Sequence, residues 1–174
     1  ATKFGETLGF ESGELIGALV LVQFIGFFAT LLYVKFADKV GIKNGIYVAI
    51  FAYIIIILSG YFVHELWQFY LVAGMIGCFQ GGIQTLSRSL YFRIIPKDKS
   101  AEFFGFFNMW GKFAAVIGPA LMGSVTWMLS SITSDEILSA RLGLQSIIIL
   151  FILGAFVLSK VNISEGEKIA KEYL

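Results

Sequence analysis

The chain has 174 residues, of which 57% are hydrophobic, 16% aromatic and only 14% charged, and its mean hydropathy is +0.83. Soluble domains carry about a quarter charged residues, so this composition excludes an ordinary water-soluble domain. Several apolar stretches reach the roughly 20 helical residues that a bilayer core requires, and they lack the alternation of barrel strands. Because only helices or a closed barrel can span lipid, the sequence predicts an all-α, polytopic membrane protein.

The apolar stretches predict five transmembrane spans, so that a five-helix transmembrane domain occupies residues 14–160. It follows an extracytoplasmic segment, 1–13, and precedes a polar cytoplasmic tail, 161–174, expected to be a surface helix or disordered. Only two residues separate the second span from the third, which requires an antiparallel hairpin. The predicted spans cover residues 14–36, 45–63, 66–92, 101–129 and 141–160.

Basic residues gather at one end of these spans. Lys3 and Arg141 fall at the opposite end, and Lys112 lies inside the fourth span. By the positive-inside rule the larger group lies in the cytoplasm, which places the N-terminus outside and the C-terminus inside. The ten residues of this group are Lys35, Lys39, Lys43, Arg88, Arg93, Lys97, Lys99, Lys160, Lys168 and Lys171.

Polar side chains interrupt the first, third and fourth spans. Gln80, Gln84 and Arg88 are spaced four residues apart, as are Asn108 and Lys112, so each set forms a stripe along one helix face. Polar groups without partners are costly in hydrocarbon, so we expect the stripes to face one another or a wet cavity. For Gln23 and Gln80, hydrogen bonds to neighbouring helices are an equally good interpretation. The candidate cavity residues are Gln23, Gln80, Gln84, Asn108, Trp110 and Lys112.

Lys112 is the strongest candidate for a functional side chain. It lies roughly 15 Å into the fourth span, too deep for a lysine to reach a helix end easily. No carboxylate occurs between Glu102 and Asp135. We expect Lys112 either to be capped by carbonyls of a neighbouring helix or to face a cavity. In a cavity it would bind a substrate carboxylate or neutralise an acid on another helix.

Small residues lie on one side of the third and fourth spans, where they let helix backbones approach closely. Gly118 and Pro119 predict a kink deep in the fourth span, either as a fixed bend or as a moving gate. The second and fifth spans are apolar nearly all round and are expected at the bundle periphery, against lipid. The small residues are Gly74, Gly77 and Gly81 in the third span and Gly111, Ala115 and Gly118 in the fourth.

The loop after the first span has the pattern Asp-Lys-x-Gly-x-Lys. It resembles the loop motif of the major facilitator superfamily, except that the leading glycine of that motif would fall at Val34. Residues 81–123 resemble more specifically the vacuole-effluxer-like branch, related to autophagy-related amino-acid effluxers, and residues 21–41 fit the same branch. The matching motif positions are Asp38, Lys39, Gly41 and Lys43.

This resemblance implies that the five spans are helices eight to twelve of a twelve-helix transporter, with helices eight, ten and eleven lining its cavity. Residues 1–13 would then include the end of helix seven, and the N-terminal half would be missing. The resemblance also implies a cytoplasmic gate in which Asp38 meets the start of the fourth span and Lys39 or Lys43 pairs with Glu102. The implied gate residues are Asp38, Lys39, Lys43, Arg88, Arg93 and Glu102.

The leading hypothesis is a secondary transporter that moves a small solute, such as amino acids or related metabolites, by alternating access. The alternative is a non-transporting assembly or scaffold protein, or a remnant half-transporter. An enzyme is not expected, because the spans hold no His, Cys or carboxylate cluster for catalysis or metal binding. No cofactor and no nucleic acid are expected. The expected partners are a small-molecule substrate, the lipid of a bacterial plasma membrane and the N-terminal half, on the same or a separate chain.

Overall fold

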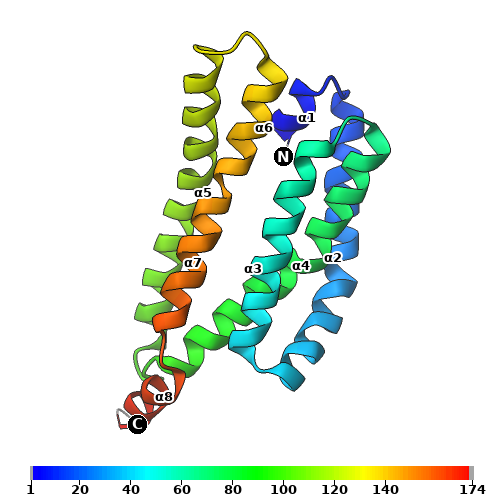
Figure 1. Cartoon of the computed structure of the whole chain (residues 1–174). Coiled ribbons are helices and arrows are strands. Elements are labelled where there is room, and N and C mark those ends of the chain that lie inside the picture. The colour runs from blue at the N-terminus through cyan, green and yellow to red at the C-terminus, as the bar shows by residue number, and fades with distance from the viewer. Residues whose placement is uncertain (1, 173–174) are drawn as a thin grey trace.

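A computed structural model of the chain describes residues 2–172, with side chains for residues 4–171. The expectations for Ala1, for the Lys3 side chain and for residues 173–174 lie outside this part of the chain. The described part contains helices and no strand, which confirms the all-α class. In chain order (Figure 1) the helices are α1 (Thr2–Thr7), α2 (Ser12–Val40), α3 (Ile42–Ser59), the 3-10 helix η1 (Gly60–Phe62), α4 (Leu66–Ile94), α5 (Ser100–Ser130), α6 (Glu136–Ser146), α7 (Ile148–Lys160) and α8 (Ile163–Glu172).

Five helical segments of the described chain are long and apolar enough to cross a membrane, as the sequence predicts. They are α2, α3 together with η1, α4, α5, and α6 together with α7. Each of the predicted spans falls within one of them to within a residue, and most of these helices extend beyond the predicted apolar run. The helices are longer because their polar end turns remain helical where they leave the lipid.

The stretch between the first two predicted spans is helical almost throughout, and Gly41 alone separates α2 from α3. Gly41 has a φ of 91°, a backbone conformation that favours glycine, and its N–H donates to Ala37 O at 2.8 Å. The hydroxyl of Tyr33 donates to Gly45 O at 2.8 Å and so joins the two helices beside the turn. The turn is therefore tighter than the eight-residue loop, 37–44, that the predicted spans leave between them.

The fifth span begins earlier than predicted and is interrupted. Asp135 caps α6, since its carboxylate accepts a hydrogen bond from the Leu138 N–H at 2.9 Å. A carboxylate before the first turn satisfies an N–H that has no partner inside the helix. The capping residue lies outside the predicted apolar span, six residues before its start at Arg141. The regular α-helix breaks at Ile147, which separates α6 from α7.

Helices α2 and α4 form the most extensive contact between helices of the described chain, and it includes the glycines predicted for close packing on the third span. A Cβ placed on Gly77 would lie 2.8 Å from the carbonyl oxygen of Val22. One placed on Gly74 would lie 3.3 Å from the Ile25 side chain. Gly81 would likewise meet the side chain of Thr30. The close packing predicted for this face of α4 is therefore confirmed, and its partner is α2.

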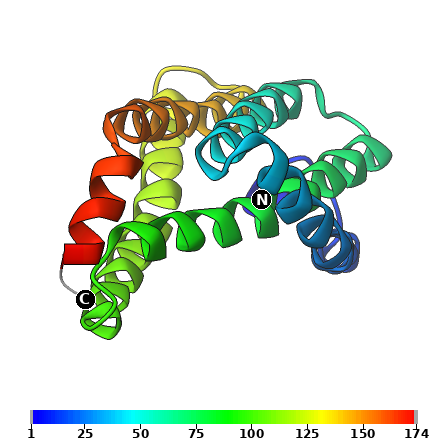
Figure 2. The same ribbon diagram turned by 90° about the horizontal axis from the view of Figure 1, so that it is seen from below.

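Helix α5 has no such neighbour along its middle. All residues from 108 to 117 are exposed, and a Cβ on Gly111 or Gly118 would meet nothing within 4 Å among the described residues. The helix contacts the rest of the bundle mainly at its ends, and α2 and α5 lie on opposite sides of the molecule (Figure 2). The close packing predicted for Gly111, Ala115 and Gly118 is thus not formed within the described chain.

The second span packs against other helices on one face and is exposed on the other. In its most apolar window 39% of the residues of α3 and η1 are buried, against 11% for α2 and none for α5. Helix α3 contacts α2, α4 and α7. On the other face of α3, Phe51, Ile55 and Leu58 are 66%, 45% and 45% exposed, so its expected position at the bundle periphery stays a prediction. In the fifth span 6% of that window is buried, and its expected position against lipid stays a prediction.

Candidate functional site

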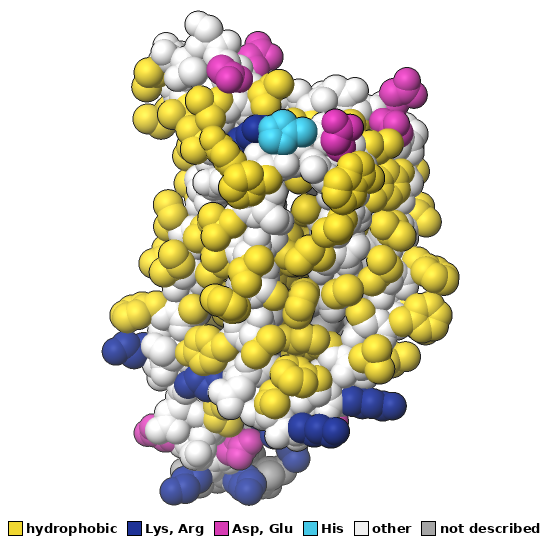
Figure 3. Space-filling view, turned by 45° about the vertical axis from the view of Figure 1, so that its right-hand side comes forward, with side chains coloured by type: hydrophobic (Ala, Val, Ile, Leu, Met, Phe, Trp, Pro, Cys, Tyr) yellow, Lys and Arg dark blue, Asp and Glu magenta, His cyan; other side chains and the backbone are white. Residues whose placement is uncertain are grey.

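Charged side chains of the described chain concentrate at the two ends of the bundle, with an apolar band between them (Figure 3). The antiparallel helices bring the C-terminal ends of α2, α4 and α7, together with α8, to the same end. The ten basic residues predicted to lie together are in the last turns of these helices, in the turns that follow them, at the start of α3 and on α8. His64 lies at the opposite end (Figure 3). The cytoplasmic position of the basic end stays a prediction.

Lys112 and Asn108 lie on the open middle section of α5. Both side chains are exposed, and within the described residues neither forms a hydrogen bond or an ion pair. Lys112 is about 18 Å along the helix from Ser100, at 1.5 Å per residue. The carbonyl cap that was one of the two expectations for Lys112 is not formed by this chain. The other expectation, a lysine that faces a cavity, stays a prediction.

Trp110 does not share a face with Lys112. Two residues on an α-helix are about 200° apart, so these side chains leave α5 on nearly opposite sides. Trp110 is 57% exposed and contacts Phe106 and Phe113, with ring centroids 6.0 and 6.1 Å away. The side chain therefore belongs to an aromatic surface of α5, and one cavity wall on this helix cannot contain both Trp110 and Lys112.

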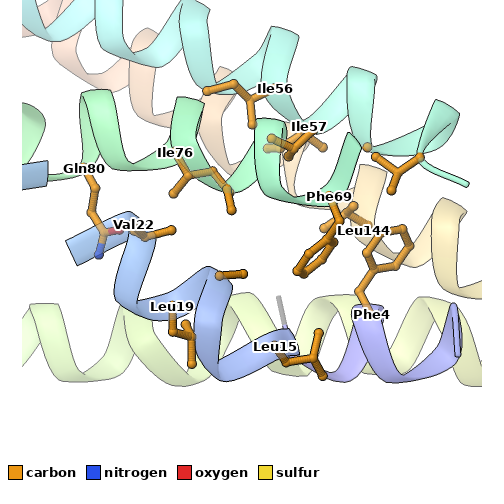
Figure 4. A pocket seen from close by; sticks show the side chains of 15 residues that line it. Phe4, Leu15, Leu19, Val22, Ile56, Ile57, Phe69, Ile76, Gln80 and Leu144 are labelled. Atoms are coloured by element: carbon orange, nitrogen blue, oxygen red, sulfur yellow. The ribbon is translucent and has the colours of Figure 1, made fainter. Parts of the chain in front are cut away.

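Gln80 lies at one end of an apolar cavity of about 180 Å³ (Figure 4). The walls come from α1, α2, α3, α4, α6 and the η1 turn, and Gln80 is the only polar side chain among the lining residues. Phe4, Leu15 and Phe69 line the far end of the cavity. An amino acid carries two charges that such walls cannot solvate, so this cavity does not suit a charged solute.

The other predicted cavity residues are exposed. Gln84 follows Gln80 by one turn on α4 and Arg88 follows by another, so the stripe leads from the apolar cavity toward the basic end. Gln23 is exposed on α2. Within the described chain no hydrogen bond joins the polar stripe on α4 to the one on α5. The expectation that the two stripes face one another stays a prediction.

The ion pairs expected in the predicted cytoplasmic gate are not formed among the described residues. Lys43 does not pair with Glu102; its ammonium donates to the carbonyls of Val161 at 2.7 Å and Ser159 at 3.3 Å. Carbonyls at the end of a helix carry partial negative charge and attract a cation, which explains why Lys43 binds α7. The remaining gate residues are exposed, and within the described side chains none forms an ion pair: Asp38, Lys39, Arg88, Arg93 and Glu102.

The start of α5 is held by α4 rather than by the loop that contains Asp38. The hydroxyl of Tyr91 donates to Phe103 O at 3.1 Å. The ring of Tyr91 also packs against Phe104 and Phe107, with centroid distances of 5.6 and 4.8 Å. Helix α5 runs without interruption through Pro119. The kink expected at this proline stays a prediction.

Two side chains that the sequence did not single out join segments far apart in the chain. Arg141 donates from Nη2 to Val63 O at 2.9 Å, and its guanidinium lies 5.6 Å from the centroid of the Tyr61 ring. Tyr33 joins α2 to α3 as described above. Neither contact has a signal in the sequence, because each depends on a partner that only the fold brings near.

Five helices long and apolar enough to cross a membrane, with a basic end and polar groups in mid-span, define a polytopic membrane protein. Comparison with known families agrees, since the sequence model "Vacuole effluxer Atg22 like" matches residues 1–171. The chain therefore belongs to the vacuole effluxer Atg22-like family of MFS-type transporters. This is a class of transporters, not of enzymes.

Individual relatives place the chain in the same family. The uncharacterized MFS-type transporter YxiO of Bacillus subtilis (strain 168) is 35% identical over 161 residues, which cover 92% of this chain and 36% of YxiO. Autophagy-related protein 22 of Yarrowia lipolytica is 30% identical over 108 residues, or 62% of this chain and 17% of that protein. The chain thus spans little more than a third of YxiO. No solved structure matches it.

Proposed function

We propose that this chain forms the C-terminal part of a secondary transporter that moves a small solute, with amino acids as the first substrates to test, by alternating access. The relatives named as vacuole-effluxer-like and MFS-type transporters support a transport function. We further propose that the basic end lies in the cytoplasm of a bacterial cell and that the chain acts in the plasma membrane.

The observation that carries the proposal is the position of Lys112 on an open helix. A lysine at the centre of a transmembrane helix costs about 2.5–3.5 kcal/mol on insertion scales, so it needs water, an acid or a bound ligand. The described chain supplies no acid or carbonyl to Lys112. A cation in a central cavity would meet this need by binding the carboxylate of an amino acid.

The unpacked middle of α5 supports a cavity between two halves. Helix α5, which the family resemblance places at the cavity, has no buried residue in its most apolar window. The resemblance places further helices, including the N-terminal half, against such faces. The exposed gate residues would correspond to a cytoplasmic side that is open, and Asp38 would meet the start of α5 when it closes.

The test is transport by the full-length protein in proteoliposomes with a panel of labelled amino acids. Lys112→Ala is expected to lower the uptake rate at limiting substrate by about tenfold or more, because it removes a charged hydrogen-bond donor. Ile117→Ala, an exposed position about 140° around the same helix, is the matched control and should transport normally. Full activity of Lys112→Ala would contradict the role of this lysine.

The length of the native open reading frame separates this proposal from its alternative. A frame that encodes six or seven further spans before this chain supports a complete transporter. A frame confined to this chain would favour the second candidate, a scaffold or remnant half.

A further inference from the structure

Helix α8 is docked on the basic end of the bundle rather than extended from it. It packs against the C-terminal end of α4 (Figures 1 and 2). A Cβ on Gly166 would lie 2.9 Å from Ile94, and Ala170 and Ile95 are buried at the contact. Because small and apolar side chains form this contact, α8 holds its charged residues in a defined position beside α4.

The docking of α8 creates a hollow of about 430 Å³ with a positive lining. Three cations from three segments line it: Arg93 at the end of α4, Lys97 in the turn that follows, and Lys171 on α8. Glu167 is the only carboxylate in the lining, and within the described side chains it forms no ion pair with them. Three positive charges against one negative charge leave an excess of two around the hollow, a potential that attracts anions.

The hollow lies where the apolar part of the bundle ends. Phe92, which also lines it, is 47% exposed, and Ile169 on the neighbouring α8 is 46% exposed. Exposed apolar side chains next to cations are typical of the boundary between the hydrocarbon and the lipid headgroups. Phosphate groups of lipids lie at this level, and anionic headgroups bind basic pockets at transmembrane helix ends.

We propose that this hollow binds a phosphate group, which in the membrane is supplied by the headgroup of an anionic phospholipid. The guanidinium of Arg93 can donate two parallel hydrogen bonds to phosphate oxygens, and the two lysines add compact charges. The hydroxyl of Ser89, also in the lining, is a further donor. The site is separate from the proposed transport cavity and does not depend on the transport proposal.

The chain offers matched variants for a test. Lys97→Gln and Lys171→Gln each remove one cation from the hollow. Lys99→Gln and Lys168→Gln remove the same charge from the same turn and the same helix, at exposed positions outside the lining. All four replacements leave the apolar docking of α8 intact, and thermal unfolding of each purified full-length variant checks that it is folded.

Native mass spectrometry of the full-length protein measures retention of phosphatidylglycerol against phosphatidylcholine. Each hollow variant is expected to weaken phosphatidylglycerol retention about fivefold, the contribution of one cation near an anionic membrane, and the control variants should retain it normally. Titration with inorganic phosphate in detergent forms the second arm. If the hollow variants alone lose phosphate binding and the protein shows no preference for phosphatidylglycerol, the site is supported and its ligand is free phosphate. The proposal would be overturned if the hollow and control variants changed binding equally, or if neither set changed it.

Discussion

Replacing Gly77 by alanine probes the contact between α2 and α4. The new Cβ would lie 2.8 Å from Val22 O and 3.2 Å from Val22 Cα. Both are backbone atoms within a helix, so no rotamer change can relieve the overlap. The helices must separate locally, and the neighbouring glycine contacts must lengthen with them.

The expected magnitude follows from two opposing effects. Overpacking of a close contact costs about 1–3 kcal/mol. Alanine in place of glycine favours the helix by up to about 1 kcal/mol. At Gly154, on α7, a Cβ would meet nothing within 4 Å, so Gly154→Ala receives only the favourable effect. The two variants should therefore differ in free energy of unfolding by about 1–3 kcal/mol, with Gly77→Ala the less stable.

Equilibrium unfolding of both variants in mixed detergent micelles, followed by helical circular dichroism, measures this difference. Gly77→Val, with a larger side chain at the same point, should be less stable than Gly77→Ala. Equal stability of Gly77→Ala and Gly154→Ala would show that α2 and α4 do not approach as closely as the structure places them, and would refute the reasoning.

Three further contacts make separate predictions. Lys43→Gln removes the cation that binds the last carbonyls of α7. Amide hydrogen exchange at that helix end should become faster, by an amount equivalent to about 0.3–1 kcal/mol of local stability. Unchanged exchange would contradict this. Tyr33→Phe keeps the ring but loses the hydrogen bond to Gly45, and should lower stability in micelles by about 0.6–1.7 kcal/mol. A larger loss would mean that ring packing changed as well. Arg141→Met removes the bond to Val63 and the ring contact, and should cost about 1–2 kcal/mol in the same assay; a neutral result would place Arg141 in solvent.

The membrane class and the spans were predictable because hydropathy acts on each stretch of chain independently of the others. Lipid requires about 20 apolar residues and a helical backbone, and both are visible in the sequence. The clustering of basic residues was predictable for the same reason, since antiparallel neighbours bring alternate helix ends together. The early start of α6 was missed because its cap, Asp135, lies outside the apolar window.

The candidate site was predictable only in part. Lys112 and Asn108 could be identified from their depth in an apolar span, and both lie on the open middle of α5. The inclusion of Trp110 ignored the helical angle between it and Lys112. Lys43 was assigned to a charge pair from the loop motif, and its actual partners are backbone carbonyls, which no residue pattern displays.

The sequence by itself determined the solvent, the secondary structure, the charge polarity and the family, because each depends on residue types along a continuous stretch. The tertiary structure decided which apolar helix is buried, which glycines touch and where α8 docks. It also decided that Arg93, Lys97 and Lys171 surround one hollow. These depend on steric fit and Coulomb interactions between segments far apart in the chain, and such contacts exist only after the helices have packed.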